Sequence, residues 1–545
     1  MNDLFATIIK EAIRRKIKSS ESFDELKKEI CGHFGVTAPR NANIRDFYEQ
    51  SLALGNSKDF SRGRKKAELL LLKKILKSKN VRTLSGVAVV AVLTKQYPCR
   101  GKCLYCPTEK EMPKSYLSNE PAVMRAITVN FDPYRQVQKR LRALEINGHD
   151  IDKIELIVMG GTFSDLPKKY QYNFIAECYR AANNYSLDVR RLKNQRRRTS
   201  TLLREQKRNE TAKHRIIGLT PETRPDTLDE KEINFYRELG ATRVEIGVQS
   251  IFDDVLKRNR RGHDVAQTIK ATKLLKNAGF KVSYHMMPGL LGSNFKKDLK
   301  MFKEIFSNPD FQPDLIKIYP CVVTRNSDLY KLWKLGKYKA LTNKNAEKLI
   351  CEIKKFVPPY VRISRLIRDI PATSIVAGPN ISNLRQLIQN KGIKCNCIRC
   401  REIRGNYTTK DKITLNRIDY NASGGKEIYL EYVSPDHRKL YSVMRLRIAS
   451  PYRRPTSTKK KTSDVNGFAV IREVHTYGKL LNLGAKNKNS PQHAGLGKKL
   501  IIEAEKIAKK EFNCQKISVI AGIGVREYYR NLGYKLKNTY MTKNI

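Results

Sequence analysis

Residues 87 to 366 alternate short apolar runs, rich in β-branched residues, with longer helical segments. This alternation predicts repeated strand–helix units around a parallel sheet, arranged either as a barrel or as an open sheet. We therefore expect an α/β fold over this region. The expected strands are Val87–Leu93, Ile154–Met159, Ile216–Leu219, Arg243–Val248, Lys281–His285, Leu315–Tyr319 and Val361–Leu366.

The chain has 545 residues, which is too long for one ordinary hydrophobic core, so two or more domains are expected. Residues 1–80 are predicted to be helical and basic. Residues 81–385 contain the alternating pattern, and residues 386–412 form a cysteine-rich linker. A different α+β pattern occupies residues 413–545 and predicts a separate C-terminal domain.

The charge of the chain indicates a polyanionic partner. Lys and Arg number 107 against 53 acidic residues, which gives a formal net charge of +54. Basic clusters at residues 10–18, 62–66 and 190–215 are typical of surfaces that grip phosphates without reading sequence. A generally cationic, solvated surface is the alternative, but a nucleic acid is the favoured partner.

The remaining composition favours a cytoplasmic protein that binds metal. No apolar run approaches the roughly 20 residues of a membrane span, and residues 1–18 have no signal-peptide core. Seven of the 11 cysteines lie in or near two clusters. In a cytosolic protein this grouping favours metal sites over disulfides.

The first cluster has the spacing C-x3-C-x2-C and follows the first expected strand; it comprises Cys99, Cys103 and Cys106. Three thiolates can hold three irons of a 4Fe-4S cluster and leave the fourth iron open for S-adenosylmethionine. The spacing resembles the radical-SAM superfamily, and the resemblance extends from about residue 85 to 385. A structural zinc site or a redox thiol set is the alternative.

Polar residues follow the expected strands at their C-terminal ends, where the active sites of parallel α/β barrels lie. Gly160, Gly161 and Thr162 come directly after one strand, where the glycines would allow the methionine amino group to approach the backbone. Glu222 follows the next strand, where it could hold ribose or a carboxylate, and Gln249 ends another. We expect these residues to contact S-adenosylmethionine.

The second cluster, Cys395, Cys397 and Cys400, is a compact set of soft ligands that suits tetrahedral zinc. One ligand is missing locally, and Cys321, at a strand end, is the candidate for it. A second iron–sulfur cluster is the competing interpretation, and simple buried thiols are disfavoured by the spacing.

The C-terminal region carries a glycine-rich turn before an amphipathic helix. The pattern Q-x-x-G-x-G resembles the GNAT acetyltransferases, in which backbone N–H groups face the pyrophosphate of acetyl-CoA. Tyr528 matches a tyrosine near the thioester sulfur in that family and could protonate the leaving thiolate; a core aromatic is the alternative. The expected acetyl-CoA contacts are Glu473, Val474, His475, Thr476, Gln492, Gly495, Leu496, Gly497 and Tyr528.

Several further runs, taken in order, closely resemble the catalytic subunit of Elongator over nearly the whole chain beyond residue 80. They are MRAITVNFDPY, VMGGTF, ETRPD, EIGVQS, RGH, HMMPGL, KIYP and RDIP. The resemblance implies a radical-SAM partial (β/α) barrel, a C-terminal GNAT domain, and tRNA as the substrate. It also implies that Lys153 contacts acetyl-CoA, although charge alone would make Lys153 an ordinary surface residue. Residues 1–80, which lie outside the resemblance, are expected to bind tRNA because of their basic clusters.

The implied reaction forms 5-carboxymethyluridine at the wobble position of the tRNA anticodon. A 5'-deoxyadenosyl radical would take hydrogen from the acetyl methyl group, and the carbon radical would add to carbon 5 of the uridine. Loss of an electron and a proton, with thioester hydrolysis, would complete the reaction. Lys281 and Tyr319, at strand ends, are candidates for polar groups near the thioester; ordinary strand-end packing is the alternative.

Two other functions remain open at this point. A protein lysine acetyltransferase would act on basic tails, which a surface of +54 would repel. A non-catalytic tRNA-binding scaffold is disfavoured by the intact cysteine triad. The compact spacing between Cys99 and Cys103 resembles archaeal members, which favours action without the other Elongator subunits but with an external electron donor. Thr108 and Glu109 stand where the family often has two glycines.

Overall fold

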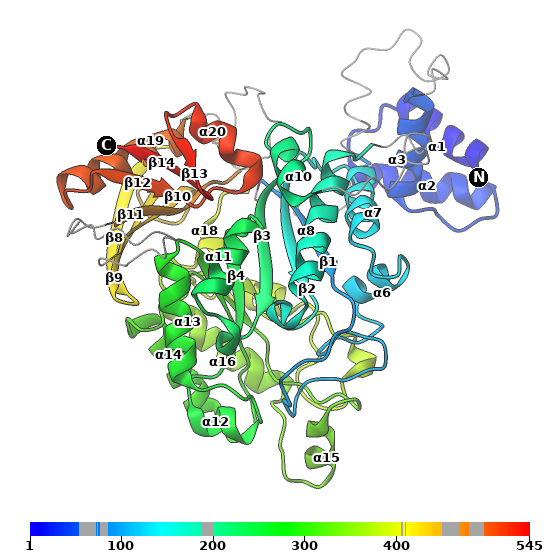
Figure 1. The fold of residues 1–545 in the computed structure, drawn as a ribbon. Coiled ribbons are helices and arrows are strands. Elements are labelled where there is room, and N and C mark those ends of the chain that lie inside the picture. Colours follow the sequence, from blue (N-terminus) through cyan, green and yellow to red (C-terminus); the bar gives the residue numbers. More distant parts are fainter. Residues whose placement is uncertain are drawn as a thin grey trace.

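The computed structural model describes residues 1–53, 72, 75–76, 86–186, 201–404, 407–408, 410–449, 468–478 and 495–545. Within these ranges the chain forms N-terminal helices, a central parallel sheet wrapped by helices, and a C-terminal sheet (Figure 1). The fold class expected from the sequence is confirmed. None of the described helices has the length and apolar character needed to span a bilayer.

The central sheet is a half-barrel. Its seven strands are parallel and pair in the order in which they occur along the chain. Among the described residues β1 and β7 do not pair, so the barrel stays open along one line, here called the seam. The strands are β1 (Ala88–Leu93), β2 (Lys153–Met159), β3 (Arg215–Thr223), β4 (Arg243–Gln249), β5 (Lys281–Met286), β6 (Leu315–Ile318) and β7 (Arg362–Arg365).

Most helices of this region cover the outer face of the half-barrel and share its hydrophobic core (Figure 1), and three pack in smaller apolar clusters. Side-chain caps fix where several of them begin; for example, Asp264 and Gln267 form a capping box at the start of α13. The helices are α6 (Pro121–Ile127), α7 (Pro133–Ile146), α8 (Lys168–Asn183), α10 (Leu202–Asn209), α11 (Glu230–Glu238), α12 (Asp253–Arg258), α13 (Val265–Asn277), α14 (Phe295–Ser307), α15 (Asp328–Lys334), α16 (Asn343–Lys355), α17 (Leu384–Asn390) and α18 (Ile398–Arg401).

The C-terminal sheet has the strand order β13-β14-β12-β11-β10-β9-β8. Helix α19 (Leu496–Lys510) packs its apolar face on β10 and β11 and forms a second core. A short helix, α20 (Arg526–Arg530), precedes the last hairpin. The strands are β8 (Thr414–Ala422), β9 (Gly425–Val433), β10 (Leu440–Ala449), β11 (Phe468–Thr476), β12 (Lys516–Val519), β13 (Lys535–Lys537) and β14 (Tyr540–Asn544).

The N-terminal helices form a small core of their own. Helices α1 (Asn2–Arg14), α2 (Ser20–His33) and α3 (Asn41–Ala53) pack together through their apolar faces. Helix α3 also contacts α7 of the half-barrel, where Asp46 lies 3.8 Å from Arg142. Of the three basic clusters, only that at residues 10–18 lies wholly within the described residues.

The C-terminal sheet packs against the ends at which the half-barrel strands begin. Gly522 approaches β3 so closely that a Cβ atom would lie 2.0 Å from the carbonyl oxygen of Ile217, so a residue with a side chain would not fit at this position. Arg472 of β11 forms ion pairs with Asp314, before β6, at 2.5 Å, and with Glu427 of β9 at 3.0 Å. These belong to a fully buried group, here called the interdomain ion network: Lys276, Asp314, Glu427, Arg445, Arg447 and Arg472.

Candidate active site

The half-barrel encloses a cavity of about 880 Å³, here called the lumen. Alternate residues of β1, β2, β4 and β6 point into it, as the two-residue period of a strand requires. The lining includes Cys99, Cys103 and Cys106 at the ends where the strands finish. It also includes Arg243 and Arg362, the first residues of β4 and β7. One cavity therefore joins the cysteine rim to the mouth that faces the C-terminal sheet.

Two guanidinium groups hold the cysteine rim in a positive environment. The Arg261 Nη1 atom lies 3.4 Å from the Sγ atom of Cys103, and Arg224 Nη1 lies 3.9 Å from it. A hydrogen bond from Cys106, together with Arg261 and Arg224, lowers the pKa of the Cys103 thiol. Positive charge of this kind stabilises thiolate ligands, so the rim suits an anionic iron–sulfur cluster.

The glycines predicted to meet S-adenosylmethionine lie beside this rim. Gly160 has φ +131°, and a Cβ atom there would lie 2.0 Å from the Thr94 hydroxyl oxygen, so only glycine fits. The hydroxyl of Thr162 lies 3.6 Å from the Cys99 sulfur. Gln249 also lines the lumen, and its buried amide oxygen has no hydrogen-bond partner among the described residues. An unpartnered buried oxygen is suited to a bound ligand.

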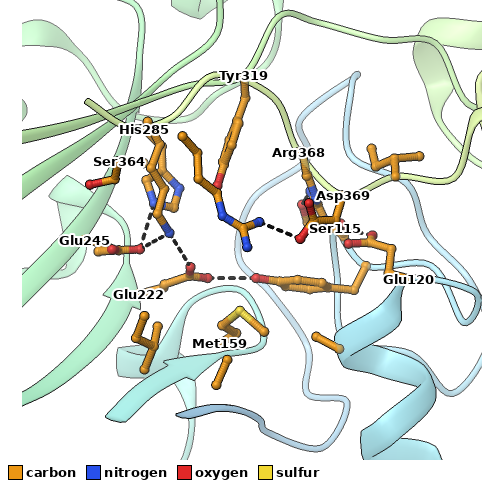
Figure 2. A pocket seen from close by; sticks show the side chains of 18 of the residues that line it. Ser115, Glu120, Met159, Glu222, Glu245, His285, Tyr319, Ser364, Arg368 and Asp369 are labelled. Carbon is orange, nitrogen blue, oxygen red and sulfur yellow. Dashed lines mark hydrogen bonds and ion pairs between the residues drawn. The ribbon is translucent and has the colours of Figure 1, made fainter. Parts of the chain in front are cut away.

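A charged network crosses the middle of the lumen (Figure 2). Lys317 of β6 lies between two carboxylates: its ammonium is 3.4 Å from Glu222 and pairs more closely with Glu245. Glu245 also lies 3.0 Å from the His285 Nε2 atom, and Tyr116 donates to Glu222 at 2.7 Å. Strands β3 to β6 therefore bring these groups to one level of the lumen.

The network keeps its charges despite burial. Burial opposes ionisation of Glu245, but Lys317 and His285 lower the pKa of this carboxyl well below its ordinary range. Burial likewise disfavours the Lys317 ammonium, but Glu245 and Glu222 raise the pKa of this lysine above its ordinary value. The lumen thus contains a permanent cation between two acidic side chains.

We predict that Lys317→Met makes folding stability rise as pH falls from 7 to 5. Without its cation, the buried Glu245 carboxyl should have a raised pKa in the folded state. A carboxyl whose pKa is raised in the folded state stabilises the fold at pH values below its unfolded pKa. This stabilisation is lost as the pH rises through the folded pKa. Urea unfolding at several pH values measures this, and Lys317→Arg, which retains the positive charge, should not show the same trend. An unchanged pH profile for Lys317→Met would contradict the prediction.

The two residues predicted near the thioester lie at different ends of the half-barrel, and of the two only Tyr319 lines the lumen. Lys281 begins β5, and its ammonium lies 2.9 Å from Glu473 of β11. Tyr319 follows β6, and its ring centroid lies 5.5 Å from that of His285 (Figure 2). Burial raises the pKa of the Tyr319 phenol, which keeps it protonated as a hydrogen-bond donor. The structure therefore places Lys281, and not Tyr319, beside the C-terminal sheet.

The predicted acetyl-CoA residues gather where β11 and β12 separate. These strands pair in parallel only from Ala469 to Ile471, and β11 continues to Thr476 paired with β10 alone. Gly497, in the first turn of α19, faces this gap. A Cβ atom on Gly497 would lie 3.5 Å from the Tyr528 hydroxyl, 3.6 Å from the Thr476 hydroxyl and 3.7 Å from a Val474 methyl. The N-terminus of α19 thus lies beside the separated end of β11 and Tyr528, and this place is here called the β11–α19 cleft.

The other predicted residues of this region have different surroundings. Gly495, with φ +69°, caps α19 before Leu496, and Tyr528 is 43% exposed, so it is not a core aromatic. Glu473 pairs with Lys281 and with Arg445, both at the interface with the half-barrel. Gln492 lies outside the described residues.

The end of β11 lies close to the lumen. Burial opposes ionisation of Glu155, on β2, but Arg243, Lys281 and His475 lower the pKa of that carboxyl. His475 of β11 is therefore close enough to act on a side chain that lines the lumen. Lys153 begins the same strand β2, so it lies at the same end of the half-barrel.

The second cysteine cluster is compact. The sulfur atoms of Cys395, Cys397 and Cys400 lie within 4.8 Å of one another, close to the roughly 3.8 Å separation that Zn–S bonds of about 2.3 Å would give. The Lys354 ammonium lies 3.3 Å from the Cys400 sulfur. Three thiols so placed fit a single zinc ion.

The prediction that Cys321 completes this zinc site is wrong. Among the described residues, Cys321 does not join the group of Cys395, Cys397 and Cys400. Its backbone N–H donates to Pro288, and its side chain is buried in an apolar cluster with Cys103 and Tyr338, near the cysteine rim. Burial raises the pKa of the Cys321 thiol to about 12, which keeps it protonated in this apolar cluster.

Comparison with family models defines the class of protein. The chain matches the Radical SAM superfamily over residues 95–305 and the Radical_SAM C-terminal domain over residues 313–393. These matches cover the cysteine rim and the half-barrel from β2 to β7. The class of the central region is thus a radical-SAM protein, which implies a 4Fe-4S cluster and S-adenosylmethionine.

Whole-chain relatives identify the family. The chain is 44% identical over 565 residues to tRNA uridine(34) acetyltransferase of Methanocaldococcus infernus, covering 100% of this chain and 99% of the relative. It is 39% identical over 492 residues to Elongator complex protein 3 of Saccharomyces cerevisiae, covering 86% and 85%. A solved structure of the archaeal Methanocaldococcus infernus Elp3, lacking its N-terminus, matches with a TM-score of 0.70 and 44% identity, covering 84% of this chain and 99% of that one. The chain therefore belongs to the Elongator complex protein 3 family.

Proposed function

We propose that this protein modifies the wobble uridine of the tRNA anticodon to 5-carboxymethyluridine, using S-adenosylmethionine and acetyl-CoA. The observation that carries the proposal is the single lumen that runs from the cysteine rim to Arg243 and Arg362 at the strand starts, where His475 of β11 acts on the lining residue Glu155. A reaction that joins radical chemistry to an acetyl group needs both sites to open on one space. The names of the relatives, tRNA uridine(34) acetyltransferase and Elongator complex protein 3, agree with this substrate.

In this proposal Cys99, Cys103 and Cys106 hold the 4Fe-4S cluster, which with S-adenosylmethionine supplies hydrogen-abstracting radical chemistry. The backbone at Gly160 and Gly161 contacts the methionine portion, since Gly161 lines the lumen beside the cysteine rim. The remaining polar contacts to S-adenosylmethionine come from Thr162, Glu222 and Gln249.

The cleft between β11 and α19 binds acetyl-CoA. Backbone N–H groups at Gly495, Leu496 and Gly497 face the pyrophosphate at the helix N-terminus. Tyr528, exposed beside Gly497, donates a proton toward the thioester sulfur. Further contacts come from Lys153, Glu473, Val474, His475, Thr476 and Gln492.

Lys281 and Tyr319 then have separate roles. Lys281 lies beside Glu473, where an ammonium can polarise the thioester carbonyl for hydrolysis. Tyr319, held protonated in the lumen next to His285, donates a hydrogen bond to the bound base. Zinc at Cys395, Cys397 and Cys400 has a structural role between the two domains, since α18 contacts β7 and its Arg401 pairs with Glu431 of β9.

Anaerobic reconstitution tests the proposal directly. The protein is loaded with iron and sulfide, incubated with tRNA, acetyl-CoA, S-adenosylmethionine and dithionite, and the nucleosides are analysed by mass spectrometry. A 5-carboxymethyluridine peak that requires every component supports the proposal. Acetyl transfer to a protein lysine in the absence of S-adenosylmethionine would instead favour the lysine acetyltransferase alternative.

Gly497→Val is expected to weaken acetyl-CoA binding by about tenfold or more, which is about 1.4 kcal/mol. The added methyl groups would occupy the space between Val474, Thr476 and Tyr528. Calorimetric titration with coenzyme A measures the change. Gly497→Ala is the matched control, because a lone Cβ lies at ordinary contact distances and should have a smaller effect. Equal affinities for the wild type and Gly497→Val would argue against this cleft.

A further inference from the structure

A basic projection covers the outside of the cysteine rim. Residues 325–339, here called the α15 knob, include α15 and extend away from the half-barrel at the lower end of Figure 1. The rings of Tyr330 and Trp333 stack with centroids 5.9 Å apart. Leu335 is 68% exposed. Aromatic and aliphatic groups surrounded by charge are typical of a protein contact surface.

The knob is joined directly to the loop that carries the cysteines. The backbone N–H of Leu329 donates to the carbonyl of Leu104, between Cys103 and Cys106, at 2.8 Å. Leu329 and Trp333 also pack in the same apolar cluster as Cys103 and Leu104. One hydrogen bond and one layer of side chains therefore separate the knob surface from the cluster ligands.

The knob is strongly and locally basic. It contains five basic residues and one acidic residue, Asp328. The side chain of Lys331 is 79% exposed. The basic residues are Arg325, Lys331, Lys334, Lys337 and Lys339. A surface of this charge steers an acidic partner toward the cysteine rim.

The position of the knob favours a protein over RNA. No residue of the knob lines the lumen, into which the target base must pass. The lumen has basic groups of its own for a nucleic acid, including Arg125, Arg140, Arg365 and Arg368. The knob lies instead on the outer side of the cysteine loop, from which an electron can enter without competing with the substrate.

We propose that the α15 knob docks an acidic one-electron carrier protein that holds a flavin or an iron–sulfur centre. The inference rests on the proposed function, because it supplies the electron that this function needs. The reduced carrier loses one electron, the cluster held by Cys99, Cys103 and Cys106 gains it, and no covalent bond forms or breaks in the transfer. Redox encounters use small, salt-sensitive interfaces, which suits a projection of this size.

The test uses an acidic [2Fe–2S] plant-type ferredoxin and the double variant Lys331→Glu/Lys334→Glu. The affinity of the oxidised ferredoxin for cluster-free protein should fall by about tenfold or more in the variant. Reduction of the reconstituted cluster by reduced ferredoxin, followed by stopped-flow absorbance, should slow to a similar extent. Reduction by dithionite and affinity for tRNA should stay unchanged. The matched control is Lys296→Glu/Lys300→Glu on α14, which carries the same charge change on exposed lysines away from the knob.

Equal ferredoxin affinity in the double variant and the control would overturn the proposal. A loss of tRNA affinity with unchanged ferredoxin binding would also overturn it and would assign the knob to RNA. Failure of the proposed function can be distinguished from failure of this proposal. If the proposed function is wrong, the wild-type protein reduced by dithionite forms no modified uridine. Ferredoxin binding to the cluster-free protein still measures docking in that case.

Discussion

Cys103→Ala is expected to lower formation of 5-carboxymethyluridine by about 1000-fold or more, which corresponds to about 4 kcal/mol of lost transition-state stabilisation. The thiol is buried at the rim beside Arg224 and Arg261, and two remaining ligands cannot fix a cubane cluster. Iron content should fall with activity, while affinity for tRNA should persist, because the substitution leaves the basic surface unchanged. Iron analysis, nucleoside mass spectrometry and tRNA binding measure the three quantities.

The matched control for this prediction is Cys178→Ala. Cys178 is fully buried in α8, and burial raises the pKa of its thiol well above the ordinary value, so it is a core thiol. This variant should retain its iron and its product. Normal product and iron in Cys103→Ala would refute the assignment of the cluster to this rim.

Arg472→Met is expected to destabilise the whole chain by about 3 kcal/mol, because it removes one partner from a buried ion network. Asp314 and Glu427 would each lose an ion pair at a site where no side chain is exposed. In the wild type, burial opposes ionisation of Asp314, but Arg472 and its neighbours lower the pKa of this carboxyl. Asp314 precedes β6 and Glu427 lies on β9, so the loss should weaken the contact between the two domains.

Urea unfolding followed by circular dichroism measures this effect as a lower transition midpoint. Lys355→Met is the control, since Lys355 pairs with Glu352 at 2.7 Å on the surface of α16. An exposed pair of this kind contributes less than about 1 kcal/mol. Equal midpoints for Arg472→Met and Lys355→Met would show that the network has little effect on stability.

The elements of the half-barrel could be predicted because their signals are local. All seven expected strands occur, and β4 begins at Arg243 as expected. The largest difference is β3, which continues to Thr223 instead of ending at Leu219. Thr220–Thr223 is polar and contains a proline, so its sequence resembles a loop, but pairing of Glu222 with Glu245 of β4 extends the strand. Non-local pairing of this kind leaves no local signal.

The charged network of the lumen was missed for a related reason. Glu245, His285 and Lys317 occur on three different strands and meet only because those strands are neighbours in the sheet. A signal was nevertheless present, since Glu245 and Lys317 are charged residues inside apolar parallel strands, where burial requires a partner. The prediction for Cys321 failed because its position after a strand does not show at which end of the half-barrel the second cysteine cluster lies.

Strand direction could have separated Lys281 from Tyr319. In a parallel sheet all strands begin at one end and finish at the other, so the first residue of one strand and the last residue of another lie at opposite ends of the sheet. Lys281 opens β5 and Tyr319 follows β6, so their backbones lie at opposite ends of the half-barrel. The structure accordingly gives them separate surroundings.

The seam between β1 and β7 has a consequence for which uridines can react. The cysteine loop and the C-terminal sheet cover the two ends of the lumen, so we expect a base to enter through the seam. A base within a helix must first lose its stacking and pairing, at a cost of a few kcal/mol, whereas a loop nucleotide is already unstacked. A few kcal/mol is a preference of about a hundredfold or more. The enzyme would therefore discriminate among tRNA positions by the mobility of the nucleotide before any contact reads its identity.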